Sequence, residues 1–241
     1  MNLQTETWTD VADVETDLAL LPVGSTEQHG PHAPLGTDSL NAETVAAAGA
    51  ERYEAEHGDP VVVGPPVTVG ISEEHRAFDG TLWVSPDTFR SYVRETVESL
   101  AHHGFDRVVL VNGHGGNVDA LREVSARLTR DGTASTAPFT WFDSVGEHSS
   151  DMGHAGPLET AMLRHTNPDL VREDRIEEAQ KGGSDRWGEW VSGVNLAYDS
   201  DEFTENGVVG DPAAGDADRG AELLDLASEG LVELLDALAA K

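Results

Sequence analysis

The sequence predicts an α/β fold with a mostly parallel sheet and helices on both of its faces. Short apolar runs alternate with longer amphipathic stretches along the 241 residues. Strands that are separated by helices form parallel sheets, because each helix crosses over a face of the sheet. This length suits one domain with a sizeable core. We therefore expect a single domain over 1–241, with a loop or lid region at about 182–216.

The elements follow from the alternating pattern. The expected strands are the apolar runs at 18–24, 60–67, 106–117 (a strand that runs into a glycine loop) and 134–143. The expected helices are the amphipathic stretches at 39–58, 85–105, 118–132, 156–166 and 216–240. Gly58 stops the first of these helices, and Ser85 caps the second, with Pro86 in its first turn.

The charge balance is strongly acidic. The chain has 45 Asp+Glu against 15 Lys+Arg, which gives a formal net charge of -30. Because salt screens such self-repulsion, we interpret the acidity as adaptation to a salty, halophilic cytoplasm. A surface that recruits a basic partner is the alternative. The sequence has no Lys/Arg cluster that would bind phosphates, so nucleic acid is not an expected partner.

Cysteine is absent, so any metal must be held by nitrogen and oxygen ligands. The first 17 residues, MNLQTETWTDVADVETD, lack the basic and apolar regions of a signal peptide. No apolar run approaches the roughly 18 residues that a membrane span needs. We therefore expect a cytoplasmic protein with no membrane partner.

The segment 23–38, VGSTEQHGPHAPLGTD, gathers acids and histidines at the end of the first strand. Glu27 and His29 are two residues apart, so an extended backbone points both side chains the same way. Glycines permit turns here and prolines stiffen them, so the loop loses little entropy when it holds its side chains. Asp38 alone fits equally well as the N-cap of the following helix.

Further histidines and acids follow in two other loops. His114 lies in VNGHGGN after the third strand, while His154 and Glu159 lie in DMGHAGPLET at a helix start. In parallel α/β sheets, chemistry gathers beyond the carboxyl ends of the strands. Imidazoles and carboxylates without sulfur suit Zn²⁺, Mn²⁺ or a related ion. The donors suffice for two ions that share a carboxylate.

These motifs resemble those of the creatininase family of metal-dependent amidohydrolases. Segments 70–89 and 207–220 add to the resemblance, and the motifs keep the family's order over most of the chain. The resemblance implies a three-layer α/β/α sandwich and a homo-oligomer, with a hexamer favoured. It also implies two divalent ions per chain, Zn²⁺, Mn²⁺ or Fe²⁺. The implied reaction is hydrolysis of a non-peptide C–N amide bond, in creatinine or a related small molecule, by a metal-activated water.

The resemblance also implies roles for individual residues. The two metals would share Asp38, with Glu27, Asp38 and His114 at one site and His29, Asp38 and Glu159 at the other. His154 would be the catalytic residue that gives a proton to the leaving nitrogen. His32 is expected to orient neighbouring ligands through a hydrogen bond.

The substrate is less constrained by the sequence. Creatinine hydrolases of the family carry an acid at the position of Gly116 and a tryptophan at that of Ser150, and both departures weaken creatinine as the substrate. Other tryptophans that could cover the site instead are Trp141, Trp187 and Trp190. The candidate substrate contacts are Glu73, His75 and Ser150, although an exposed polar loop explains the first two equally well.

Other functions remain open from the sequence. One alternative is a formamide hydrolase that acts on a formylaminopyrimidine ribotide in archaeal flavin or deazaflavin biosynthesis, and another family branch trims a peptide in a redox-cofactor pathway. A different class is a catalytically silent metal-binding assembly. An acidic interaction protein would explain the charge and leave the motifs unexplained.

Overall fold

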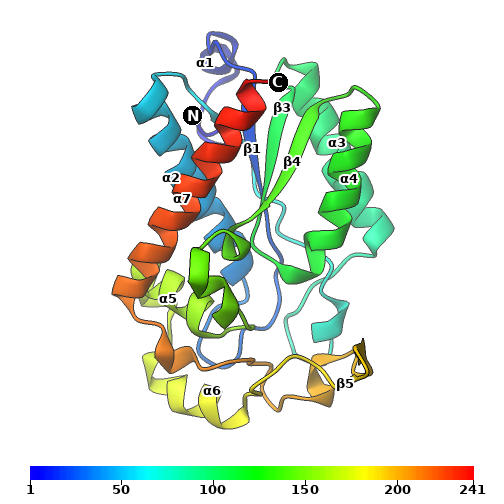
Figure 1. The fold of residues 1–241 in the computed structure, drawn as a ribbon, viewed down its shortest axis with the longest axis vertical. Helices are drawn as coiled ribbons and strands as arrows, with labels where there is room; N and C mark the ends of the chain where they lie inside the picture. Colours follow the sequence, from blue (N-terminus) through cyan, green and yellow to red (C-terminus); the bar gives the residue numbers. More distant parts are fainter.

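The computed structural model describes residues 1–241 and places a four-stranded parallel sheet between two layers of helices (Figure 1). The strands lie in the order β2-β1-β3-β4. Their bounds are β1 Leu18–Val23, β2 Val62–Val63, β3 Arg107–Asn112 and β4 Ser135–Thr140. The helices are α1 Trp8–Ala12, α2 Thr37–His57, α3 Pro86–His102, α4 Val118–Arg130, α5 Pro157–Thr166, α6 Ile176–Gly182 and α7 Ala217–Ala239. The predicted α/β/α sandwich is confirmed.

The two helical layers bury alternate residues of the strands. Leu18 and Leu20 of β1 join the apolar cluster under α2, α5 and α7. Ala19 and Leu21 point the other way, into the cluster under α3 and α4. Successive side chains of a strand face opposite sides of a sheet, so one fully buried strand supplies both cores.

Several strand and helix boundaries differ from the prediction. The strand expected at 60–67 is only Val62–Val63, because Pro65 and Pro66 lack the N–H groups that would continue the ladder. The chain rejoins β1 by a single bridge from Val67. The fourth strand ends at Thr140, and the next residues form a 3-10 turn.

Of the two predicted helix N-caps, one is confirmed and the other is wrong. Ser85 caps α3, since its side chain accepts a hydrogen bond from the backbone N–H of Thr88. Asp38 is not the N-cap of α2: Gly36 holds that position without a side-chain hydrogen bond, and Asp38 lies in the first turn with 1% of its surface exposed. A side chain that only capped the helix at the surface would be exposed to water. The burial of Asp38 therefore indicates a different role for this carboxylate.

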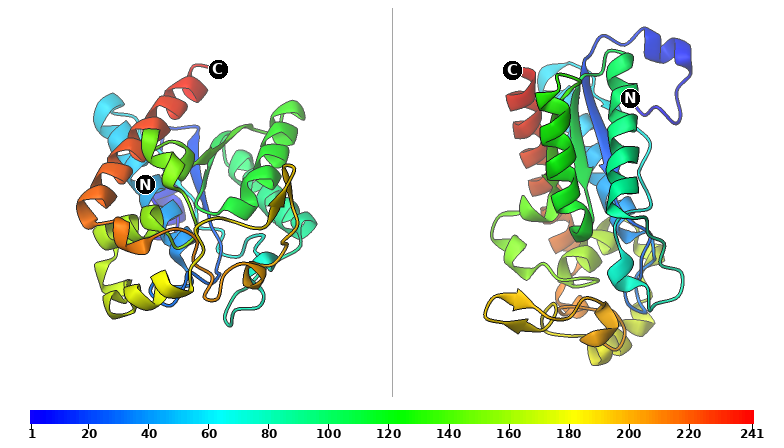
Figure 2. Two further views of the ribbon diagram at one scale, coloured as in Figure 1. Left: turned by 60° about the horizontal axis from the view of Figure 1, so that its bottom comes forward. Right: turned by 90° about the vertical axis from the view of Figure 1, so that its right-hand side faces the viewer.

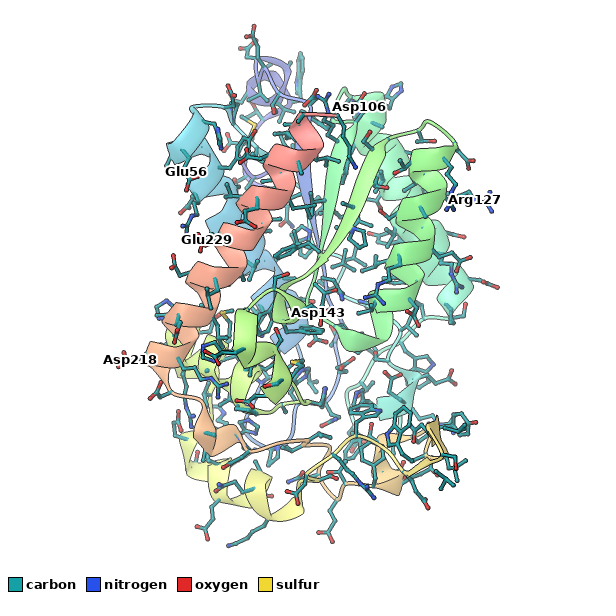
Figure 3. All side chains as sticks on the ribbon, viewed as in Figure 1. Glu56, Asp106, Arg127, Asp143, Asp218 and Glu229 are labelled. Atoms are coloured by element: carbon teal, nitrogen blue, oxygen red, sulfur yellow. The ribbon has the colours of Figure 1, made fainter.

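Charged side chains cover the outer faces of the helices. Glu56 on α2, Asp218 and Glu229 on α7, and Arg127 on α4 all point away from the sheet (Figure 3). Many of the ion pairs join exposed groups, and such pairs add little stability. No helix is both long and apolar enough to span a bilayer.

Loops from several parts of the chain meet at the carboxyl end of the sheet, whereas α1 lies at the opposite end (Figure 1). This end lies at the bottom of Figure 1, where α5, α6 and the segment after it close over the strand ends (Figures 1 and 2). The region expected as a loop or lid at 182–216 holds an antiparallel hairpin, β5 Trp190–Val191 and β6 Val194–Asn195. Its remaining structure consists of 3-10 turns at Ser200–Glu202 and Pro212–Ala214.

Candidate metal centre

The loop after β1 meets the start of α2 because Gly24 has no side chain. A Cβ on Gly24 would lie 2.4 Å from the backbone nitrogen of Ser39. The close approach brings Asp38, in the first turn of α2, next to the residues that follow β1. His29 Nε2 consequently lies 3.1 Å from Asp38 Oδ1.

The loop after β3 is fixed by two asparagines. Asn112 holds both backbone ends of His114, accepting from its N–H and donating to its carbonyl. Asn117 donates to the carbonyl of Gly24 and so ties this loop to the end of β1. A Cβ on Gly113 would lie 2.2 Å from the Asp38 carbonyl oxygen, so glycine is needed for this contact.

The third contribution comes from the start of α5. Ala155 has φ 51, a left-handed conformation that is strained for a residue with a side chain. This conformation points the Ala155 N–H at Glu159 Oε2, with an N–O distance of 2.5 Å. Backbone strain of this kind clusters at functional sites, so its position next to His154 and Glu159 supports a functional role for this segment.

The loops bring carboxylate oxygens and imidazole nitrogens within 3.1 to 3.7 Å of one another without forming hydrogen bonds between them. His114 Nδ1 lies 3.1 Å from Glu27 Oε1 and 3.3 Å from Asp38 Oδ2. His29 Nε2 lies 3.7 Å from Glu159 Oε1. Donor atoms within 4.8 Å of one another form three overlapping sets: Glu27, His29 and Asp38; His29, His154 and Glu159; Glu27, His75 and His154.

The cluster is buried, and its polar atoms lack partners. Glu27, Asp38 and Glu159 are at most 3% exposed. Both carboxylate oxygens of Glu27 and of Asp38, and Nε2 of His29, are buried without a hydrogen-bond partner. Buried charges are costly unless they are paired or coordinate a metal. A set of nitrogen and oxygen donors with free lone pairs is what a divalent cation such as Zn²⁺ or Mn²⁺ would satisfy.

Backbone carbonyls orient two of these imidazoles for coordination. His29 Nδ1 donates a hydrogen bond to the carbonyl of Glu27 at 3.2 Å. Nε2 is therefore the nitrogen with a free lone pair that could bind a metal. His114 Nε2 donates to the carbonyl of Ile71 at 2.7 Å, which leaves Nδ1 free. A hydrogen bond to the other ring nitrogen is the usual support of a metal-binding histidine.

The pKa shifts show how strongly the acids attract positive charge. Burial acts to lower the pKa of His29, but Asp38 and Glu159 outweigh it and raise that pKa well above its ordinary value. Burial likewise opposes Glu27 and Asp38 at His114, whose pKa is also raised. Burial acts to raise the pKa of Asp38, yet His29 and His114 hold it below its usual range. A bound cation would satisfy the same carboxylates.

A cavity of about 730 Å³ opens over the cluster. His75, His114, His154 and Glu159 reach its floor. Trp187 also lines it, with its ring nearly perpendicular to the rings of His75 and His154 at centroid distances of 5.7 and 6.0 Å. The volume lies within the range of about 300–1,000 Å³ that is usual for small-molecule sites.

The other predicted site residues lie in different surroundings, some in the cavity and some outside it. His75 is fully buried in the cluster, so the exposed-loop interpretation is wrong for it. Glu73 lies outside the cavity lining and pairs with Arg76 in solvent, as that interpretation expects. Ser150 lines the cavity, where its hydroxyl donates to the carbonyl of Glu147. His32 is buried against the hydroxyl of Thr160 at 3.0 Å, next to Glu159.

The three candidate tryptophans also lie in different parts of the structure. Trp141 is fully buried in the core under α2, α5 and α7, Trp190 is 52% exposed on the hairpin, and only Trp187 reaches the cavity. Sequence reasoning missed Glu74 and Arg186, which also line the cavity. Arg186 is the only Lys or Arg among the lining residues. Its position next to Trp187 in the sequence is the signal that could have identified it as a candidate site residue.

Fold and site together define a class: an α/β/α sandwich whose carboxyl-edge loops hold a buried cluster of potential metal ligands. Residues 4–235 match the family model Creatininase, described as creatinine amidohydrolase. The chain therefore belongs to the creatininase family, and the predicted resemblance is confirmed.

Curated relatives carry two kinds of name. The mycofactocin precursor peptide peptidases of Mycobacterium ulcerans and Mycolicibacterium smegmatis are 39% and 41% identical over 163 and 160 residues, 65% and 66% of this chain. The chain spans only 61% and 62% of their lengths. Creatinine amidohydrolase of Pseudomonas putida is 30% identical over 182 residues, 65% of this chain and 67% of that protein.

Solved structures agree on the fold. A protein described as a candidate creatinine amidohydrolase from Bacteroides fragilis superposes with a TM-score of 0.83 at 25% identity, covering 100% of this chain and 97% of its own. Two creatininase structures, one described as Mn and one as a Zn-Zn type mutant, give TM-scores of 0.77 and 0.75 at 21% identity. Both cover 97% of this chain and 96% of their own, and at that identity they show the fold alone.

Proposed function

We propose that this chain hydrolyses an amide bond with two divalent metal ions bound at the carboxyl edge of its sheet. The observation that carries the proposal is the set of buried carboxylate oxygens without partners on Glu27 and Asp38. Asp38 supports a bridging role, because its two oxygens face different histidines, His29 and His114. Glu159 would complete the ligand set beside His29.

The chemistry divides between the metals and the chain. When bound, such ions lower the pKa of a water molecule and polarise the amide carbonyl. His154 presents its unprotonated Nδ1 to the cavity, because its Nε2 donates to the carbonyl of Gln28 at 2.6 Å. Nδ1 takes the proton of the attacking water and passes it to the leaving nitrogen as the C–N bond breaks. Burial, followed by the charge of His29, lowers the pKa of His154, which favours the unprotonated form.

We further propose that the amide belongs to a peptide rather than to creatinine. The names of the mycobacterial relatives support a peptide, and so does a cavity much larger than the creatinine ring. The acid that creatinine hydrolases carry is replaced by Gly116, where a Cβ would lie 2.2 Å from the Ile71 carbonyl oxygen. Arg186 offers the cavity a positive charge for a peptide carboxylate. A non-peptide amide remains the sequence-based alternative.

A hydrolysis screen with metal analysis tests both parts. The protein would be purified in molar salt and loaded with Zn²⁺ or Mn²⁺. It would then be given creatinine, a formylaminopyrimidine ribotide and short peptides with free or amidated carboxyl ends. We expect cleavage of a free-carboxyl peptide and slower cleavage of its amidated form. Cleavage of creatinine or the ribotide alone would overturn the peptide assignment. Metal binding without any cleavage would favour the silent metal-binding assembly.

A further inference from the structure

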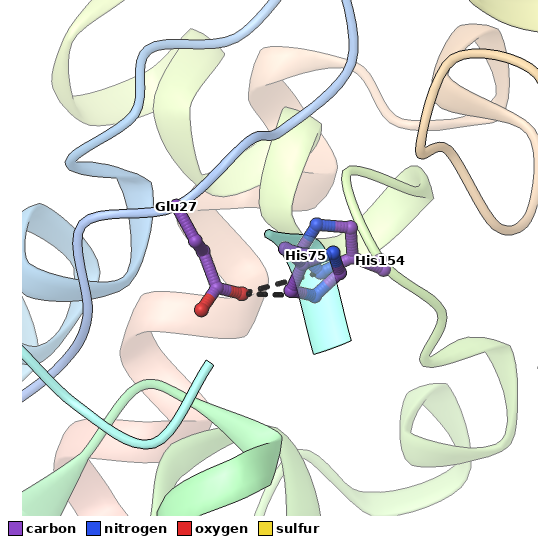
Figure 4. Close-up of side chains that lie close together, drawn as sticks. All are labelled: Glu27, His75 and His154. Carbon is purple, nitrogen blue, oxygen red and sulfur yellow. Dashed lines mark ion pairs between the residues drawn. The ribbon is translucent and has the colours of Figure 1, made fainter. Parts of the chain in front are cut away.

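His75 and His154 form a stacked pair at the floor of the cavity. Their ring centroids are 4.3 Å apart, with an interplanar angle of 22°. His75 Nε2 and His154 Nδ1 lie 3.4 and 3.7 Å from the same carboxylate oxygen, Oε1 of Glu27 (Figure 4). What each ring does at this carboxylate depends on which of its two nitrogens carries the proton.

The proton of His154 is fixed by the backbone. Its Nε2 lies 2.6 Å from the carbonyl oxygen of Gln28. A carbonyl oxygen can only accept, so His154 carries its proton on Nε2 and turns the lone pair of Nδ1 towards the cavity.

The proton of His75 is fixed by the side chain of the same Gln28. Two backbone groups decide how that amide points: the N–H of Gly30 donates to Oε1 at 2.9 Å, and Nε2 donates to the carbonyl of Gly207 at 3.1 Å. The second N–H of the amide therefore faces His75 Nδ1, at 2.8 Å. His75 Nδ1 must accept this hydrogen bond, so the proton of His75 lies on Nε2, the nitrogen that faces Glu27.

The surrounding backbone holds Gln28 in this position. Gly207 has φ +85, and a Cβ there would lie 1.8 Å from Gln28 Oε1, so the segment before α7 closes directly on the amide. Ser200 is the one group that could reverse the assignment. Its Oγ lies 2.8 Å from His75 Nδ1 and can donate to the carbonyl of Glu74 at 3.0 Å, so it could accept a proton from Nδ1. That arrangement would place two N–H groups against each other between His75 and Gln28.

We propose that Gln28 is a positioning residue: it fixes the proton of His75 on Nε2, so that this ring turns an N–H towards the carboxylate of Glu27, while His154 keeps an unprotonated Nδ1 at the cavity. The catalytic part rests on the proposed amide hydrolysis. His75 Nε2 is buried and lies 3.4 Å from Glu27 Oε1, so its N–H orients a carboxylate that would hold a metal, while His154 Nδ1 carries the proton from water to the leaving nitrogen. The carbonyl carbon gains the water oxygen and loses the amine, so His75 neither gains nor loses a proton.

Nitrogen-15 NMR of histidine-labelled, zinc-loaded protein tests the proton positions without any substrate. Protonated and unprotonated ring nitrogens are resolved from each other, and His75→Asn and His154→Asn identify the two signals. We expect both rings to carry the proton on Nε2. Gln28→Glu replaces the amide N–H with an acceptor, so the proton of His75 should move to Nδ1 while that of His154 stays. Ser200→Ala, which removes the competing partner, should leave His75 unchanged.

Zinc titration, with kinetics on the peptide identified in the screen, tests the role of His75. His75→Ala and Gln28→Glu should each lower the affinity for Zn²⁺ and the activity by about 10- to 100-fold, the usual loss when the hydrogen-bonding partner of a metal ligand is removed. His75→Gln, which keeps an N–H donor, should recover part of the loss. Metal content is measured on every variant, because Glu27 lies beside both rings.

The outcomes separate the two proposals. A proton on His75 Nδ1 in the wild type, a Gln28→Glu variant that leaves that proton in place, or a shift caused by Ser200→Ala would overturn the role of Gln28. The expected proton positions with no amide cleaved would instead count against the proposed hydrolysis. Full activity and unchanged Zn²⁺ affinity of His75→Ala would remove this role from His75 even if its proton lies on Nε2.

Discussion

The loop after β1 and the hairpin β5–β6 lie at the same end of the molecule and expose opposite chemistry. In the first, Glu27 and His29 are polar and fully buried, as is Asp38 beside them at the start of α2, with 1% of its surface exposed. In the second, Trp190 and Val194 are apolar and 52% and 58% exposed. Buried polar atoms without partners need a ligand, whereas exposed apolar surface gathers where another surface binds. The loop therefore presents the atoms that an ion would need, and we propose that the hairpin contributes to the homo-oligomer that the family resemblance implies.

The largest expected effect is the loss of the metal centre. Asp38→Ala should abolish activity together with the rise in melting temperature that Zn²⁺ causes in the wild type. That rise corresponds to about 2.7 kcal/mol at a Zn²⁺ concentration 100 times its Kd. His154→Ala should keep the rise and lose turnover, because His154 moves a proton. Calorimetry with an activity assay makes the comparison, and full activity in both variants would reject the proposed mechanism.

The next effect concerns pH and the buried ring of His32. Burial, followed by the charges of His29 and Arg164, lowers its pKa to about 4. The unfolded chain binds a proton at a pKa near 6.5 that the folded chain binds only below about 4. Folding stability is therefore lost as pH falls from about 6.5 towards 4, by up to about 2 kcal/mol between pH 7 and pH 5.

Urea unfolding at both pH values measures this loss. His32→Gln should unfold with a smaller difference between pH 7 and pH 5 than the wild type shows. His103→Gln, a change of an exposed histidine at the end of α3, controls for the substitution itself. An equal difference in wild type and His32→Gln would show that His32 does not carry the loss.

A smaller effect is expected at the cavity wall. Arg186→Ala should raise KM for a free-carboxyl peptide by about tenfold, since a hydrogen bond to a charged group contributes about 1.5 kcal/mol or more. KM for the amidated peptide should change little. Arg130→Ala, which removes an exposed arginine on α4, is the matched control. Equal KM changes for both peptides would contradict a carboxylate contact.

The smallest effect on the folded chain is expected at the hairpin. Trp190→Ser with Val194→Ser should lower the mass seen in sedimentation, because exposed apolar groups drive association between copies. Unfolding stability measured on the monomer should stay within about 0.5 kcal/mol. Leu170→Ser, at an exposed leucine outside the hairpin, should leave the mass unchanged. An unchanged mass in the double variant would exclude the hairpin as the contact.

The comparison also explains which features of the fold and the site could be predicted from the sequence. The three layers follow from the alternation of strands and helices, and the candidate ligands follow from motifs with local spacing. The network of Gln28 could not be found this way, because its partners His75 and Gly207 are 47 and 179 residues away in the chain. Asp38 was open to a capping role because a polar residue at a helix start has the same pattern whether it is solvated or buried.

Metal stoichiometry tests the central claim most directly. The protein and three variants would be loaded with Zn²⁺ in molar salt, freed of excess metal and measured by elemental analysis. We expect about two ions per wild-type chain, about one each in His114→Ala and Glu159→Ala, and none in Asp38→Ala, because Asp38 would bridge both sites. A wild-type chain with fewer than two ions, or an Asp38→Ala variant that binds as much Zn²⁺ as the wild type, would contradict the dinuclear centre.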